Sequence, residues 1–186
     1  MNRFFNKTDL ARNSFVKIQN EIKVMGIINQ DMRDIVDSSK LSFVATVCPD
    51  GSPNLSPKGS LRVYDDNTIV FMDIASPHTI ANLNQNPKIE INSIDFIRRR
   101  GYRFKGEAHI VPPGDPVYEW LNRWLLELNG PGYPANQAVV VKVTKALPVF
   151  SPAYTWGHAS EDDLSLAWAE EYLKAEGISG SDLQKK

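Results

Sequence analysis

The chain has 186 residues, of which 42% are hydrophobic and 23% are charged, so it can bury one substantial core but is short for two full domains. Its formal net charge of -1 provides no overall positive field for nucleic acid or for an anionic membrane surface. The single cysteine, Cys48, excludes an intrachain disulfide and is expected to be a small core residue, because it lies in an apolar run.

The first part of the chain is expected to be helical. Apolar residues recur every three or four positions from Thr8 to Met25, which predicts an amphipathic helix that Gly26 ends. A second helix is predicted from about Gln30 to Asp37, and we interpret residues 1–40 as an N-terminal helical extension. The sequence shows neither a long apolar segment near its start nor a run of about 18 apolar residues elsewhere, so we expect a cytoplasmic protein that does not bind membranes.

From Leu41 the pattern changes to that of β-strands. The stretch from Leu41 to Cys48 is rich in Val, Phe and Thr, and Pro49-Asp50-Gly51-Ser52 predicts a tight hairpin turn. This hairpin leads into a predicted strand from Asn54 to Val63. Further strands are predicted at Thr68–Asp73, Lys88–Ile94, Tyr102–Val111 and Ala138–Val143, the last extending as far as Val149.

Three helices are predicted among and after these strands. One opens at Pro77 and closes at Asn86-Pro87, one runs from Pro116 to Leu128, and a terminal helix capped by Asp162 or Asp163 runs to Glu176. Short strands, tight turns and few helices predict a mainly β (α+β) fold, in which an antiparallel barrel carries peripheral helices.

Two short motifs lie on either side of one strand and suggest a phosphate site. Ser56-Pro57-Lys58-Gly59-Ser60 precedes that strand, and Ser76-Pro77-His78-Thr79 opens the following helix. A lysine, several hydroxyls and a helix N-terminus together provide the charge and the donors that a phosphate monoester needs. The alternative interpretation of Lys58 is a solvated strand lysine.

The order of these elements resembles the pyridoxamine 5'-phosphate oxidase-like family of FMN-binding split β-barrels. In that family a basic residue on one strand and a Ser, Thr or basic cluster at the next helix start hold the FMN phosphate. The resemblance implies that residues 41–157 form an FMN-binding split-barrel domain and that residues 158–186 form a C-terminal helix and tail. Family members usually carry a basic residue at the helix start, where this sequence has His78 and Thr79, so the fixed positive charge is lower here.

The resemblance also implies which residues bind the cofactor. The expected set is Lys58, Gly59, Ser60, Asp73, Ser76, His78, Thr79, Arg100, Arg103 and Trp156. Strand alternation places Arg103 and Lys105 on one face and Tyr102 and Phe104 on the other, although a solvated basic bend is the alternative. Trp156 is expected either to reach the flavin of a partner subunit or to plug the barrel mouth.

The resemblance implies a homodimeric oxidoreductase that holds FMN at the subunit interface and passes hydride or electrons to a small-molecule substrate. True pyridoxamine phosphate oxidases end in an arginine-rich signature, whereas this sequence has an acidic helix from Glu161 to Glu176, so the vitamin B6 reaction itself is not expected. The alternatives are a flavin- or haem-binding protein without turnover and an F420-dependent reductase. The sequence shows no motif of a serine hydrolase, a zinc enzyme or a nucleotide triphosphatase, and we expect no metal.

Overall fold

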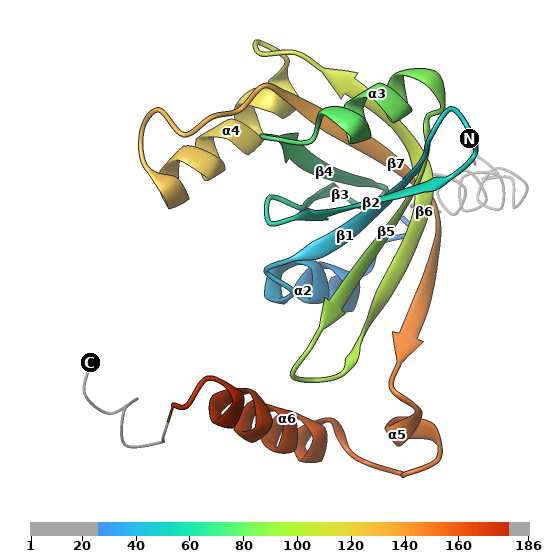
Figure 1. Ribbon diagram of the computed structural model, residues 1–186, viewed down its shortest axis with the longest axis vertical. Coiled ribbons are helices and arrows are strands. Elements are labelled where there is room, and N and C mark those ends of the chain that lie inside the picture. The colour runs from blue at the N-terminus through green and yellow to red at the C-terminus, as the bar shows by residue number, and fades with distance from the viewer. Residues whose placement is uncertain (1–25, 179–186) are drawn as a thin grey trace, which may run out of the picture.

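The computed structural model describes residues 26–178, so the predicted helix from Thr8 to Met25 lies outside the described residues. Seven antiparallel strands form one sheet in the order β2-β1-β5-β6-β7-β4-β3 (Figure 1). The strands are β1 (Ser42–Val47), β2 (Pro53–Lys58), β3 (Arg62–Asp65), β4 (Thr68–Asp73), β5 (Lys88–Asp95), β6 (Arg100–Val111) and β7 (Gln137–Phe150). The helices are α2 (Gln30–Ser38), α3 (Pro77–Gln85), α4 (Pro116–Asn129), α5 (Pro152–Thr155) and α6 (Glu161–Ala175). The expected mainly β fold with peripheral helices is confirmed.

The sheet curls because its two edge strands follow each other in the sequence. β2 ends at Lys58 and β3 begins at Arg62, so residues 59–61 join opposite edges of the sheet. Within this link the Ser60 hydroxyl accepts a hydrogen bond from the Met72 N–H at 3.0 Å, which ties the link to β4. The prediction of one continuous strand from Asn54 to Val63 is therefore wrong, because the chain leaves one edge at Gly59 and joins the other after Leu61.

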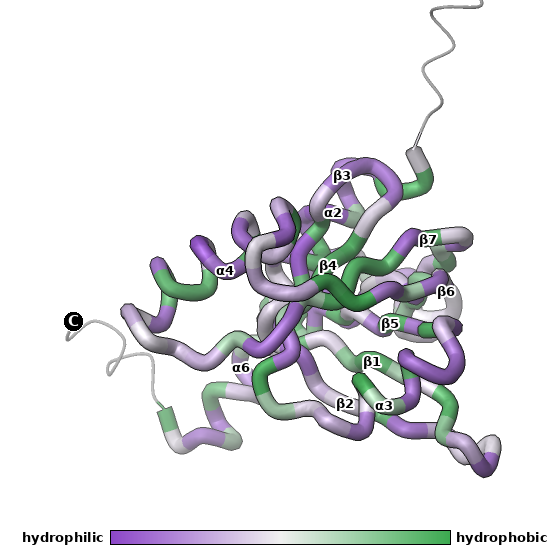
Figure 2. The backbone as a smooth tube through the Cα atoms, turned by 90° about the horizontal axis from the view of Figure 1, so that it is seen from above, coloured by the Kyte–Doolittle hydropathy of each residue, from purple (hydrophilic) through white to green (hydrophobic). Residues whose placement is uncertain are grey.

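The core has two parts, separated by the sheet. Inside the barrel, Ile69 and Phe71 of β4 pack with the other inward side chains, while Val70 and Met72 on its outer face pack against α4. Because both of its faces are covered, β4 is apolar almost throughout its length and appears green in Figure 2. The predicted helix α4 packs on the outer face of the sheet, where Leu121 belongs to a second hydrophobic cluster.

The helix boundaries follow from local capping. Asn29 caps α2 by accepting from the Met32 N–H, and α2 ends within one residue of the predicted position. For α6 the predicted caps Asp162 and Asp163 are wrong, because Ser160 is the N-cap and Asp163 bonds back to it in a capping box. The short helix α5 was not predicted, since four residues carry no periodic pattern.

We expect Gly106→Ala to destabilise the barrel by about 1–3 kcal/mol, the usual cost of overpacking. Gly106 faces inward on β6, and a Cβ atom there would lie 2.5 Å from the Lys142 carbonyl oxygen and 2.9 Å from Val141 Cγ1. Urea unfolding measures the effect. The control is Gly59→Ala, whose Cβ would meet only the Lys40 carbonyl at an ordinary 3.6 Å. Equal stabilities of the two variants would contradict the prediction.

Candidate functional site

A pocket of about 260 Å³ lies where the end of β2 meets the end of β4. Its lining residues are Ser56, Pro57, Lys58, Gly59, Ser60, Met72, Ile74 and Ala75. Three of the predicted cofactor residues therefore line one pocket, and α3 begins two residues after Ala75. The short link that closes the barrel and the turn that leads into α3 bring these groups together.

Lys58 lies on the inward face of β2, and only 7% of its surface is exposed. Its Nζ donates to Ser56 Oγ at 2.6 Å and lies 5.7 Å from the centre of the Phe71 ring. Burial lowers the pKa of the Lys58 ammonium, and the negative charge of Asp73 partly opposes that change. An ammonium carries three N–H donors, and within residues 26–178 only Ser56 accepts one of them. The remaining donors are therefore free for an anion in the pocket.

Asp73 and Ser76 organise the turn between β4 and α3. Asp73 Oδ1 accepts from both the backbone N–H of Ser76, at 3.1 Å, and its hydroxyl, at 2.8 Å. Asp73 Oδ2 accepts from Gln137 Nε2 at 3.4 Å. Ser76 is the N-cap residue of α3, but its side chain makes no capping bond because the hydroxyl is turned to Asp73. The first-turn N–H groups of α3 therefore have no side-chain cap, and this makes them available to a ligand.

The other two predicted residues of α3 differ in where their side chains lie. His78 is exposed at the helix start. The Thr79 side chain is buried, and its hydroxyl lies 3.4 Å from Asn54 Nδ2 in a polar cluster between α3 and the β1–β2 hairpin. Thr46 and Asn82 complete this cluster, with Asn82 donating to Thr46 at 3.0 Å. The Thr79 hydroxyl thus contacts other residues of the protein and does not point into the pocket. Its backbone N–H is one of the N–H groups in the first turn of α3.

Sequence reasoning did not predict three hydrogen bonds that support this site, although it placed Ser56 in the phosphate motif. Ser56 accepts a hydrogen bond from Lys58, Gln137 donates one to Asp73, and Asn54 donates one to Thr79. For Ser56 and Asn54 a signal was present, because Asn54, Ser56 and Lys58 alternate along one strand and must share a face. Gln137 carried no such signal, since only the pairing of β4 with β7 places it opposite Asp73.

The structure places Arg100 away from this pocket. Its guanidinium binds Asp31 at 3.0 Å and Glu161 at 2.6 Å, at the junction of the barrel, α2 and α6. Tyr102 donates to the same Asp31 at 2.5 Å; burial and this bond raise the pKa of Tyr102 to about 12. The hydrogen bond from Arg100 lowers the pKa of Asp31. Arg100 is thus held by two carboxylates of its own chain.

The neighbouring arginines of this bend also contact the C-terminal segment. Arg98 Nε lies 3.0 Å from Glu161, and the Arg99 guanidinium lies 4.0 Å from the centre of the Trp168 ring. Farther along β6, Arg103 binds Glu90 at 3.0 Å on the outer face, and Lys105 binds the same carboxylate. The predicted alternation of this strand is confirmed, because Tyr102 and Phe104 instead face the core.

Trp156 follows α5 and is 82% exposed. Within this chain it neither enters the pocket nor plugs the barrel. Its predicted contact with a flavin of a partner subunit stays a prediction.

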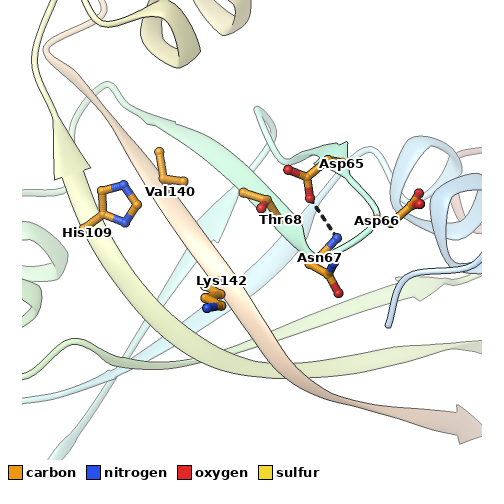
Figure 3. A pocket seen from close by; sticks show the side chains of 7 residues that line it. All are labelled: Asp65, Asp66, Asn67, Thr68, His109, Val140 and Lys142. Carbon is orange, nitrogen blue, oxygen red and sulfur yellow. Dashed lines mark hydrogen bonds between the residues drawn. The ribbon is translucent and has the colours of Figure 1, made fainter. Parts of the chain in front are cut away.

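A wider pocket of about 550 Å³ lies beside the β3–β4 turn and contains none of the predicted site residues (Figure 3). Its acidic groups already have partners within the chain. Asp65 accepts the Asn67 N–H at 2.8 Å, and Asp66 binds Arg33 at 2.6 Å. Because both carboxylates are already bound within the chain, we take the smaller pocket with the buried lysine as the candidate site.

Among residues 26–178, none of the helices combines the length and the apolar character that a membrane span requires. The same residues contain no group of three or more His, Cys, Asp or Glu side chains arranged to hold a metal ion.

Comparison with known proteins identifies relatives of this fold. The sequence profile described as "Pyridoxamine 5'-phosphate oxidase" matches residues 28–150, which is most of the chain. HupZ of Group A Streptococcus is 35% identical, with a TM-score of 0.59 over 67% of this chain and 95% of that one.

Two more distant structures share the fold. An FMN-binding protein from Syntrophomonas wolfei is 18% identical, with a TM-score of 0.57 over 78% of this chain and 99% of that one. A putative pyridoxamine 5'-phosphate oxidase from Lactobacillus delbrueckii is 17% identical, with a TM-score of 0.56 over 68% of this chain and 97% of that one.

The arginine bend gives a prediction about the C-terminal helix. We expect Glu161→Gln to loosen α6 without unfolding the barrel, because Glu161 binds both Arg98 and Arg100. Hydrogen exchange of residues 161–175 should become about tenfold faster, the effect of losing about 1.4 kcal/mol of local stability. The control is Glu171→Gln, which removes only a solvent-exposed pair with Lys174. Unchanged exchange in Glu161→Gln would show that the ion pairs do not hold the helix.

Proposed function

The chain belongs to the pyridoxamine 5'-phosphate oxidase family, and from that premise we propose that it is a flavin-dependent oxidoreductase that binds FMN by its phosphate in the pocket between β2 and β4. The observation that carries the proposal is the buried ammonium of Lys58, which has a single acceptor among the described residues and lines this pocket. A buried ammonium with unsatisfied N–H donors is costly, and a phosphate would supply both negative charge and acceptors.

The residues present fit a phosphate group in three respects. Lys58 offers positive charge, the uncapped first turn of α3 offers N–H donors, and Gly59 leaves space for close approach at the pocket wall. When bound, the flavin would supply the hydride or electron transfer. The chain would then orient the cofactor and shield it from water, while the small-molecule substrate is selected outside the phosphate pocket.

We also propose that the active species is a homodimer that covers the outer face of β2, β1, β5 and β6. Leu55 is 64% exposed on this face and pairs with Ala45 of β1, and Ala45 and Val47 line a pocket of about 480 Å³. The same pocket is lined by Lys88, Glu90, Lys105 and Glu107. An apolar strip next to charges of both signs suits a two-fold interface, in which the same surface must complement itself. FMN would lie between the subunits, and Trp156 would reach the partner's flavin.

Reconstitution with FMN tests the cofactor assignment. After incubation with FMN and removal of the free ligand, the protein should retain the two visible absorption bands of an oxidised flavin and lose them on reduction by NADH or NADPH. A Soret band on incubation with haem, without retention of flavin, would instead support the haem-binding alternative. Retention of F420 alone would support the deazaflavin reductase.

We expect Lys58→Ala to weaken FMN binding by about 1.5–3 kcal/mol, because one charge-assisted phosphate contact is lost. Thr79→Ala should cost less, since the Thr79 hydroxyl faces Asn54 rather than the pocket. Fluorescence titration of FMN measures both. Wild-type affinity in Lys58→Ala would remove Lys58 from the site, and riboflavin, which has no phosphate, serves as the ligand control.

For the dimer we expect Leu55→Glu to raise the dissociation constant of the subunits about tenfold or more, because it places a carboxylate in an apolar contact. Sedimentation measures the subunit equilibrium, and FMN retention should fall with it. The matched control is Leu128→Glu, since Leu128 on α4 is equally exposed but lies off this face. A monomeric wild type that holds FMN tightly would contradict the proposed interface.

A further inference from the structure

The proposed phosphate site has two parts that belong to different elements of the fold. Lys58 ends β2, whereas the uncapped N–H groups belong to the first turn of α3. Among residues 26–178, the side chain of Lys58 donates to Ser56 and to no residue of α3. One phosphate must meet both parts, so its affinity depends on how firmly α3 is held against β2 before the ligand binds.

A buried polar cluster joins α3 to the hairpin of β1 and β2. Thr46, on the inward face of β1, is 3% exposed, and its Oγ1 accepts hydrogen bonds from two side-chain amides. Asn54 of β2 donates to this oxygen at 3.1 Å, and Asn82 of α3 donates to it at 3.0 Å. A single hydroxyl oxygen therefore connects the strand that carries Lys58 with the helix that supplies the N–H groups.

The same two amides make one further contact each. Asn54 Nδ2 lies 3.4 Å from Thr79 Oγ1, in the first turn of α3, and Asn82 Nδ2 lies 3.5 Å from Cys48 Sγ at the end of β1. Each side-chain amide has two N–H donors, so both donors of each asparagine have an acceptor in the cluster. A displacement of α3 would break several of these bonds together, which favours one position of the helix.

The cluster and the lysine lie on the same face of β2. Asn54, Ser56 and Lys58 alternate along the strand, and Ser56 accepts the hydrogen bond of Lys58 at 2.6 Å. On the helix, Thr79 and Asn82 are three residues apart and share one face of α3. Two contacts on one helix face thus set the position of α3 relative to the strand face that carries Lys58.

We propose that Thr46 is a positioning residue of the phosphate site: its hydroxyl oxygen holds α3 against β2 through Asn82 and Asn54, so that the helix N-terminus and Lys58 meet the same phosphate. This inference rests on the proposed flavin site and adds to it a residue that does not line the pocket. Thr46 acts through the two asparagines, and the ligand is contacted by Lys58 and by the first turn of α3.

The experiment compares FMN with riboflavin, which lacks the phosphate. Fluorescence titration gives the ratio of the riboflavin dissociation constant to that of FMN, and this ratio measures the contribution of the phosphate. Thr46→Val keeps the shape of the side chain and removes the acceptor of both amides. It should lower the ratio about tenfold, because two buried donors lose their acceptor and α3 is no longer held in place. Thr46→Ser retains the hydroxyl and should keep the wild-type ratio.

A matched control separates positioning from a general loss of stability. Tyr118→Phe removes another buried hydroxyl, which donates to the Ala135 carbonyl at 3.0 Å and lies on α4, outside the site. Urea unfolding should show that both Tyr118→Phe and Thr46→Val are less stable than the wild type. Only Thr46→Val should change the ratio of the two dissociation constants.

The outcomes are distinct. An unchanged ratio in Thr46→Val overturns the inference and leaves the phosphate site standing, and so does a ratio that falls equally in Tyr118→Phe. If Thr46→Val does not fold, Asn54→Ala breaks the same link from a half-buried position, and an unchanged ratio in that variant overturns the inference. Wild-type protein that binds FMN no more tightly than riboflavin overturns both the inference and the proposed phosphate site.

Discussion

The connection from β2 to β3 is the constraint on which the rest of the structure depends. Three residues join the two edges of a seven-stranded sheet, so the sheet must curl until those edges meet. The same closure turns the last inward side chain of β2, Lys58, toward the end of β4. The Ser60 hydroxyl then fixes the link to the backbone of Met72. The candidate pocket is therefore a direct product of barrel closure.

Closure of the barrel buries the ammonium of Lys58, and the chain offsets the cost of that burial only in part. Burial lowers the pKa of Lys58, while Ser56 and Asp73 favour its charged form through one hydrogen bond and one nearby charge. Asp73 does not serve Lys58 alone, because its Oδ1 accepts two hydrogen bonds from Ser76 in the turn that starts α3 and its Oδ2 accepts one from Gln137. The result is a pocket with unused donors on the lysine, next to unused donors on the helix, and a ligand with negatively charged oxygens would satisfy both.

Much of this could be predicted from the sequence because it depends on local order. The strand at Thr68–Asp73 and α3 are consecutive, so the proximity of Asp73 and Ser76 follows from a short turn. The strand break at Gly59 could not be predicted in this way, because alternation along a strand does not reveal which edge of the sheet it joins. The same limit applies to Arg100, whose partners Asp31 and Glu161 lie 69 and 61 residues away in the sequence.

The contrast between Arg100 and Lys58 shows how the structure separates two uses of positive charge. Arg100 forms ion pairs with carboxylates of α2 and α6, and such fully matched pairs serve to hold elements together. Lys58 has a hydroxyl and a distant aromatic ring instead, and its one nearby carboxylate is committed to the turn. Sequence shows only that both residues are basic. Because an incompletely matched buried charge is costly to retain, the physical expectation is that Lys58 serves a ligand while Arg100 serves the fold.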